Sequence, residues 1–195
     1  VEFDEALEGA GVLADTEHGP SREALMALLD LRRKQIVGMQ LCPSDRIPDL
    51  DQPCGENFSY RDFIECGETQ RATRLANVPL NPATYNALFR LASEILDPLI
   101  EYFGSIKLTY GFCSPALGKH IKGRVAPKLD QHAACETQGK GGAICDRLGA
   151  ACDFLVEDES MREVADWIIE HLPFDRLYFY GDDRPLHVSV GPQEK

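Results

Sequence analysis

Three side chains in the second half of the chain have the chemistry of metal ligands: His132, Asp153 and His187. Asp153 interrupts the apolar segment 151–156, where a lone carboxylate is costly to bury unless it is paired, hydrogen-bonded or bound to a metal. His187 interrupts a second apolar segment, 186–190. Two imidazoles and one carboxylate with an open fourth position form the ligand set of a catalytic zinc site. The sequence therefore predicts a Zn²⁺ ion at these residues, where it would acidify a bound water and polarise a carbonyl group.

Two strands and a loop must position these ligands. Apolar residues alternate with His187 along 186–190, so this segment is expected to be a strand with His187 on one face. If 151–156 is a strand of the same sheet, Asp153 and His187 meet on one face, and His132 reaches them from a loop. The alternative is a purely structural role, in which the strand histidine and the strand aspartate only form hydrogen bonds within the core.

A second arrangement of ligands is open at this level. His132, Cys135, Cys145 and Cys152 could form a closed structural zinc site, because thiolates bind zinc well. Cys152 and Asp153 are adjacent on one strand and point to opposite faces, so only one of the two sites can form there. Cys135 beside a metal or beside Lys140 could also be a thiol of low pKa.

The remaining pattern predicts helices packed on one face of an antiparallel-rich sheet, an α+β fold. Ser21 and Asn81–Pro82 are typical helix starts, Pro98 should kink the second helix and Gly104 should end it. Ser160 and Glu163 form a capping-box pattern before a third helix. The expected helices are 21–37, 81–103 and 161–172, and the expected strands are 106–112, 151–156, 176–180 and 186–190, the last two joined by the turn 181–184.

Charge separates the chain into two parts. The 195 residues carry 20 Lys and Arg against 32 Asp and Glu, a formal charge of −12. Residues 1–68 hold −9 of it and residues 69–195 only −3, and no acid lies between Tyr102 and Leu129. The total makes nucleic acid an unlikely partner, because wrapping a phosphate backbone needs basic charge. The basic stretch, including Lys119, Lys122 and Arg124, is expected to bind an anionic substrate.

No apolar run approaches the roughly 20 residues that span a bilayer, so no membrane segment is expected. The seven cysteines are odd in number and include no CxxC pair, which favours reduced thiols and a cytoplasmic location. The first residue is Val1, not Met, which leaves open an upstream signal segment or further domains of a longer chain.

Seven short segments resemble six motifs of one family, in the same order. They are Phe58-Ser59-Tyr60-Arg61-Asp62-Phe63 ("F-x-x-x-E-F"), Asn77-Val78-Pro79 with Leu96-Asp97-Pro98-Leu99 ("N-x-P … L-D-P-L"), Leu108–Ser114 ("T-S-G-[YF]-R-S"), Asp130-Gln131-His132 ("S-x-H"), Gly149–Asp153 ("G-x-A-x-D") and Leu186–Gly191 ("[VW]-H-V-x-V-G"). Residues 58–191 thereby resemble the zinc D-alanyl-D-alanine carboxypeptidases and L-alanyl-D-glutamate endopeptidases. That family shares its fold with the vancomycin-resistance D,D-dipeptidases and the Hedgehog signalling domain.

The resemblance implies a Hedgehog/DD-peptidase-like fold over 58–195, preceded by an acidic extension over 1–57. It assigns His132, Asp153 and His187 as zinc ligands. The chain also departs from the pattern. The family's first His and its Asp lie seven residues apart, whereas His132 and Asp153 are 21 apart, so a loop is inserted between them.

Further departures concern the catalytic positions. Cys113 and Tyr110 replace the family's Arg and Ser, and Arg184 stands at its catalytic Glu or Asp. Asp183 is the nearby candidate for a general base, although an Asp is also an ordinary residue in such a turn.

These observations favour a metal-dependent hydrolase that attacks an amide bond of a small, peptide-like or anionic substrate. Asp183 would act as the base, and Lys119, Lys122, Arg124 and Tyr110 would bind the substrate. A non-peptidase metalloenzyme and a metal-binding interaction domain of a larger protein are the alternatives.

Overall fold

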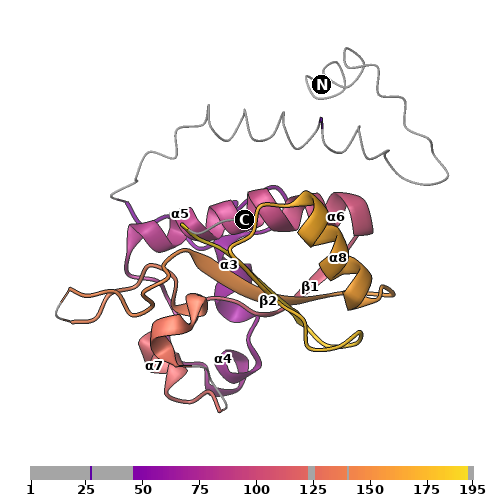
Figure 1. Ribbon diagram of the computed structural model, residues 1–195. Coiled ribbons are helices and arrows are strands. Elements are labelled where there is room, and N and C mark those ends of the chain that lie inside the picture. The colour runs from indigo at the N-terminus through magenta and orange to yellow at the C-terminus, as the bar shows by residue number, and fades with distance from the viewer. Residues whose placement is uncertain (1–26, 28–45, 123–125, 140, 193–195) are drawn as a thin grey trace. The chain divides into compact units, whose positions relative to one another are not determined.

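Four antiparallel strands form one sheet in the order β1-β2-β4-β3. The strands are β1 (Ile106–Tyr110), β2 (Ala150–Val156), β3 (Arg176–Tyr178) and β4 (Leu186–Val190). Helices pack against this sheet (Figure 1), which confirms the predicted α+β class. β4 has the predicted bounds, whereas β1 ends two residues before the predicted Phe112 and β3 ends two residues before Tyr180.

This computed structural model describes residues 27, 46–122, 126–139 and 141–192. The chain divides into two units, Val1–Leu41 and Cys42–Lys195. The sheet lies in the second unit. The helix expected over 21–37 lies outside the described residues apart from Ala27. Within the described residues, no helix has the length and apolarity needed to cross a membrane.

The strands divide their side chains between two faces of the sheet. Cys152 and Phe154 of β2 are fully buried, as is Val188 of β4, and they face the helices. Asp153 alternates with these residues and projects from the opposite face, as does its neighbour in the register, His187. One face therefore forms the core and the other carries the candidate ligands.

The predicted helix 81–103 is continuous but divided into three parts. α5 (Pro82–Leu91) begins at Asn81, whose side chain accepts a hydrogen bond from the Ala83 amide. The π-helical turn η1 (Ala92–Leu96) follows, and α6 (Asp97–Phe103) ends at Gly104, whose φ of +86° suits glycine. The disturbance expected from Pro98 therefore takes the form of a wider turn before it, because proline supplies no N–H to the helix.

α8 (Met161–His171) covers β2 with the buried side chains of Val164, Trp167 and Ile168, as predicted. The predicted capping box is wrong. Ser160 is the N-cap residue, but its side chain makes no capping hydrogen bond, and its hydroxyl instead lies 3.5 Å from Oδ1 of Asp182. A capping box does occur at α3 (Tyr60–Glu65), between Ser59 and Asp62.

The remaining helical elements are short: α4 (Glu68–Thr73), α7 (Pro115–Gly118), η2 (Pro127–Leu129) and η3 (Gln131–Ala133). In Figure 1, α4 and α7 lie on the side of the sheet opposite to α5 and α6. η3 packs on β2 and brings His132 to the face that carries Asp153.

The compact unit begins before the expected boundary at Phe58. Cys54 is fully buried, and the buried Asp97 carboxylate accepts hydrogen bonds from the amides of Glu56 and Asn57 at 2.8 and 3.2 Å. The loop before Phe58 is thus part of the same core as α6, because its backbone amides are satisfied by a residue of that helix.

The loop inserted between His132 and Asp153 is anchored by a buried glutamate. Glu136 accepts hydrogen bonds from the amides of Leu80 and Asn81 and from the Thr84 hydroxyl, at 2.8–3.2 Å. A carboxylate at a helix N-terminus is favourable because the first amides of the helix have no partner within it. The insertion is therefore fixed to the start of α5.

Candidate metal centre

Asp153 and His187 face each other across β2 and β4. They are direct partners in the antiparallel register, and Nδ1 of His187 lies 2.8 Å from Oδ1 of Asp153. The strand prediction had required such a meeting on one face, and the structure confirms it. Both side chains thus project from paired strands of the sheet, and neither lies on a loop.

His132 is held from both its backbone and its ring by the segment that follows β1. Its carbonyl accepts a hydrogen bond from the Cys113 amide at 2.8 Å, and its Nδ1 lies 2.8 Å from the Gly111 carbonyl oxygen. A carbonyl oxygen only accepts, so Nδ1 carries a proton and the neutral ring presents its lone pair at Nε2. Backbone contacts of this kind orient histidine ligands in metal sites.

The free side of the His132 ring points at Asp153. Nε2 of His132 lies 3.3 Å from Oδ1 of Asp153. Two acceptors at this distance repel each other unless a cation lies between them, either a second proton on the imidazole or a metal ion. Metal bonds of about 2.0–2.2 Å at tetrahedral angles place two ligand atoms about 3.3–3.6 Å apart, so the spacing of this pair is compatible with a shared metal ion.

The three side chains converge, and that of Asp153 is partly accessible to solvent. Their ligand atoms all lie within 4.8 Å of one another. The histidine side chains are 7% and 9% exposed, but that of Asp153 is 25% exposed. A buried pair of imidazoles beside a partly open carboxylate leaves room for a further ligand from solvent, which distinguishes an open site from a closed structural one.

Burial and the neighbouring side chains of the cluster shift the pKa values of Asp153 and His187. Burial opposes ionisation of Asp153, but the hydrogen bonds and charges of His132 and His187 outweigh it and hold the pKa of Asp153 well below its usual range. Burial lowers the pKa of His187, in spite of its hydrogen bond to Asp153. An ionised carboxylate and a neutral imidazole are the forms in which these groups bind metals.

A β-bulge in β1 adds Tyr110 to this face. Leu108 pairs with Phe154 and Tyr110 with Asp153, so Thr109 is the extra residue between them. A bulge of this kind moves the next side chain to the other face. The ring of Tyr110 consequently packs on that of His132, with centroids 4.1 Å apart. Tyr110, predicted to bind substrate, therefore lies beside the cluster.

A buried polar network ties η3 to β4. The Gln131 amide donates to Oδ2 of Asp175 at 2.7 Å and accepts from the Ser189 hydroxyl at 2.9 Å. All three side chains are almost completely buried, and Arg176 donates to Oδ1 of Asp175 at 2.9 Å. Because Gln131 precedes His132 and Ser189 lies two residues after His187, this network fixes the two histidines relative to each other.

The alternative site built on cysteines does not form. Among the described His, Cys, Asp and Glu residues, the group that converges is His132, Asp153 and His187. Cys152 is fully buried on the helix face, opposite to Asp153, and burial raises its pKa well above the usual value. The possibility of a low pKa for Cys135, which the sequence left open, is not met, because burial raises the pKa of this thiol.

Two tyrosines and an arginine that the sequence did not indicate border the cluster. The ring of Tyr178 stacks on His187, with centroids 5.0 Å apart and planes at 24°. Burial and the Asp153 carboxylate raise the pKa of Tyr180, which places this phenol near the cluster as well. Arg147 donates to the Tyr178 hydroxyl at 3.0 Å. The sequence did contain a signal for these tyrosines, because Tyr178 and Tyr180 alternate along the segment predicted to form a hairpin with the His187 strand.

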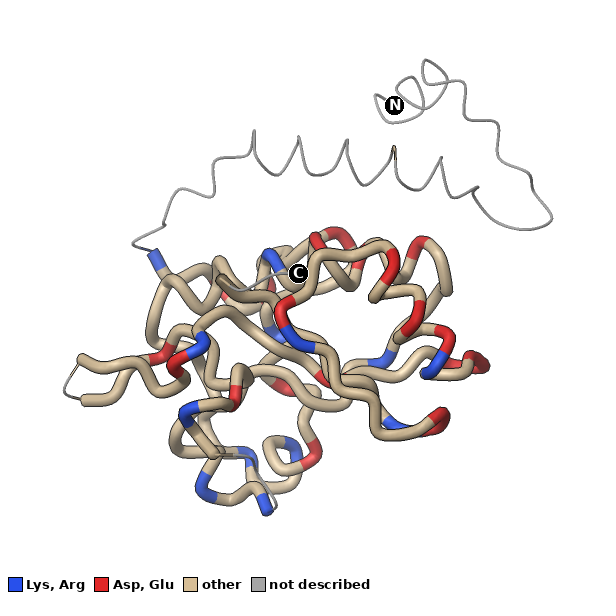
Figure 2. The backbone as a smooth tube through the Cα atoms, viewed as in Figure 1, with Lys and Arg blue, Asp and Glu red and all other residues tan. Residues whose placement is uncertain are grey.

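The other predicted residues lie elsewhere or outside the described part. Lys and Arg residues are frequent along the chain around α7 (Figure 2), and Lys119 lines a pocket between α7 and the inserted loop. Lys122 is exposed, and Arg124 lies outside the described residues. Asp183 is exposed on the turn between β3 and β4, and it stays a prediction as the general base.

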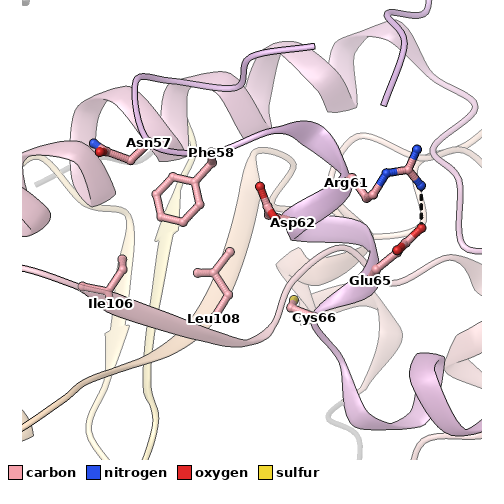
Figure 3. Close-up of a pocket in the computed structure, with 8 residues that line it drawn as sticks. All are labelled: Asn57, Phe58, Arg61, Asp62, Glu65, Cys66, Ile106 and Leu108. Atoms are coloured by element: carbon pink, nitrogen blue, oxygen red, sulfur yellow. Dashed lines mark hydrogen bonds and ion pairs between the residues drawn. The ribbon is translucent and has the colours of Figure 1, made fainter. Parts of the chain in front are cut away.

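A separate pocket of about 380 Å³ lies between α3 and β1 (Figure 3). Leu108 lines it from β1, and because Leu108 pairs with Phe154, the pocket is on the helix face of the sheet. Arg61 is held by Glu65 at 2.7 Å across one side. Burial raises the pKa of Cys66 in this pocket to about 12, so its thiol is protonated at neutral pH. The pocket is thus not part of the His–Asp–His cluster.

Comparison of the chain with protein-family models, with characterised proteins and with solved structures gives no match. The His132–Asp153–His187 cluster is therefore the main structural indication of function.

Proposed function

We propose that the protein is a metal-dependent hydrolase, in which His132, Asp153 and His187 hold a zinc ion and the bond cleaved is an amide bond of a small anionic substrate. The observation that carries this proposal is the convergence of the three side chains, whose ligand atoms all lie within 4.8 Å of one another, with Nε2 of His132 3.3 Å from Oδ1 of Asp153. The resemblance of residues 58–191 to zinc carboxypeptidases of the Hedgehog/DD-peptidase fold supports the same assignment.

The residues around the cluster fit such an ion. The Gly111 carbonyl fixes the His132 tautomer, and the Gln131 network fixes the spacing of the two histidines. A zinc ion bound by such ligands lowers the pKa of a water molecule and polarises a carbonyl group. Asp153 is accessible enough for a substrate to approach, and the Tyr110 and Tyr178 rings form the walls against the two histidines.

The turn between β3 and β4 supplies the proposed base. Asp182 lies against the start of α8, 3.5 Å from the Ser160 hydroxyl and 3.5 Å from Nε of Arg162. Asp183 is exposed beside it, and a carboxylate can accept a proton from water as a general base.

Metal content and turnover test this proposal together. The protein is purified without chelators, its zinc is measured, and release of amines from a mixed pool of N-acetylated dipeptides is followed. We expect about one zinc per chain and activity that a chelator removes and added zinc restores. Asp153→Asn should lose both, whereas Asp182→Asn, an exposed matched control, should keep both.

Two other outcomes discriminate between the alternatives. Stoichiometric zinc without any amine release would favour the metal-binding interaction domain, for which the buried Cys113 at the family's arginine position is the supporting observation. Protein that neither contains nor takes up zinc would overturn the proposal.

A further inference from the structure

One arginine of the inserted loop reaches the rim of the candidate metal centre. Nη1 of Arg147 donates to the Tyr178 hydroxyl at 3.0 Å and to the Leu129 carbonyl at 3.5 Å. The Tyr178 ring in turn stacks on His187. A single side chain therefore separates the guanidinium from one of the proposed ligands.

The register of the sheet puts this guanidinium on the same face as the cluster. Tyr178 and His187 are direct partners across β3 and β4, and side chains of directly opposed residues project from the same face. β3 is the outer strand of the sheet, so this side of the cluster is not covered by a further strand. Tyr178 is 39% exposed and Arg147 is half-buried, which leaves both within reach of a dissolved ligand.

Arg147 has donors available for such a ligand. Within the described part of the chain its hydrogen bonds use Nη1, and its Nε and Nη2 make none. The planar fork of a guanidinium matches the two oxygens of a carboxylate, and such charge-assisted pairs are stronger than neutral hydrogen bonds.

Two other arginines near the sheet are already engaged. Arg176 is bound to the buried Asp175, and Arg162 lies 4.5 Å from the ring centroid of Phe179. Cys113, at the family's arginine position, is a fully buried thiol. Lys119 lines the pocket beside α7, whose described lining includes none of the three proposed ligands.

We propose that Arg147, held in place by Tyr178, binds a carboxylate group of the substrate while the bond to be cleaved lies at the His132–Asp153–His187 cluster. This inference rests on the proposed function. It assigns the substrate to molecules with a free carboxylate near the scissile amide, and it gives the inserted loop the role of supplying the substrate-binding cation.

Thiols that carry a second group at a variable distance test this directly, because thiolate sulfur binds zinc. The probes are 3-mercaptopropionate, 4-mercaptobutyrate and 5-mercaptopentanoate, each paired with its amide. Dissociation constants are measured by calorimetry on the zinc-loaded full chain at low salt. In at least one pair, the carboxylate should bind about 10- to 100-fold more tightly than the amide.

Variants then identify the cation. Arg147→Gln should reduce this preference to about one without changing the affinity for the amide, and Arg147→Lys should keep part of it. Tyr178→Phe keeps the ring on His187 but removes the hydroxyl that holds Arg147, so it should weaken the preference at unchanged zinc content. Arg162→Gln is the matched control and should retain the full preference.

The outcomes separate the two proposals. Thiols that bind without any preference for the carboxylate, or a preference that survives Arg147→Gln or disappears with Lys119→Gln, overturn the role of Arg147 and leave the metal centre intact. Failure to load zinc overturns the proposed function and this inference with it.

Discussion

Asp153 and His187 are direct register partners in two neighbouring antiparallel strands, and their side chains are in contact at 2.8 Å. The ladder between β2 and β4 keeps the two residues directly opposite each other, so both side chains start from fixed positions on the same face. The position of His132, the third proposed ligand, depends on tertiary contacts, because η3 reaches the sheet through the Gly111 carbonyl and the Gln131 network. The properties of the cluster should therefore be most sensitive to changes around His132.

Gly111→Ala should displace the carbonyl that orients His132. A Cβ at position 111 would collide with the Phe63 carbonyl oxygen, so the backbone of this segment would have to move. We expect zinc affinity to fall about 10- to 100-fold, the usual effect of losing an outer contact to a ligand, together with lower stability. Gly142→Ala is the control, because a Cβ there meets nothing within 4 Å. Equal zinc affinity in the two variants would contradict the role of Gly111.

Gln131→Leu should weaken zinc binding without touching a ligand. It leaves Asp175 and Ser189 buried without their Gln131 partner, which costs about 1–3 kcal/mol of the free energy of unfolding. Zinc affinity should also fall, by about 10- to 100-fold. Competition with a chelator and urea unfolding measure the two effects, and the exposed Gln138→Leu is the control. A loss of stability at unchanged zinc affinity would show that the network does not position His132.

Glu136→Ala should destabilise the protein by about 1–3 kcal/mol, because the variant leaves amides at the start of α5 and the Thr84 hydroxyl without their acceptor. Glu136→Gln should cost less, since the amide oxygen still accepts. Exposed Glu157→Ala should change the free energy of unfolding by less than about 0.5 kcal/mol. Urea unfolding of the three variants checks this, and equal stabilities would refute the anchoring of the inserted loop by Glu136.

Cys66 should react slowly with alkylating reagents in the folded protein. Its pKa is raised to about 12 by burial, so the thiolate, the reactive form, becomes abundant only well above pH 8. Alkylation by iodoacetamide at pH 8, followed by peptide mass spectrometry, should label Cys66 at least about 100-fold more slowly in the native than in the urea-unfolded chain. Rapid native labelling would reopen a role for this thiol as a nucleophile.

The meeting of Asp153 and His187 on one face of the sheet could be predicted because alternation along a strand is a local property. Asp153 and His187 each interrupt an apolar segment, and the register places them together as expected. The packing of α8 through Val164 and Trp167 followed from the same kind of pattern. The capping box was wrong because the Ser160 hydroxyl contacts Asp182, a residue of a distant turn.

Contacts between segments that are distant in the chain could not be predicted from local sequence patterns. The bulge at Thr109 brings Tyr110 to the cluster, and no local pattern distinguishes it from a regular strand residue. Arg147 contacts Tyr178 from the inserted loop, 31 residues earlier in the chain, and no local pattern indicates this contact. The sequence pointed to the basic stretch near α7 as the source of the substrate-binding cation, and this stays a prediction beside our proposal for Arg147.

X-ray absorption at the zinc edge of the zinc-loaded full chain tests the central claim most directly, because it reports the elements bound to the metal. We predict two imidazole nitrogens and carboxylate oxygen at about 2.0–2.2 Å, with no sulfur, and loss of the bound zinc in Asp153→Asn. His171→Gln, which alters a histidine stacked on Trp167 outside the cluster, should give the unchanged spectrum. A sulfur shell at about 2.3 Å would mean that cysteines hold the zinc, and would contradict the assignment of His132, Asp153 and His187.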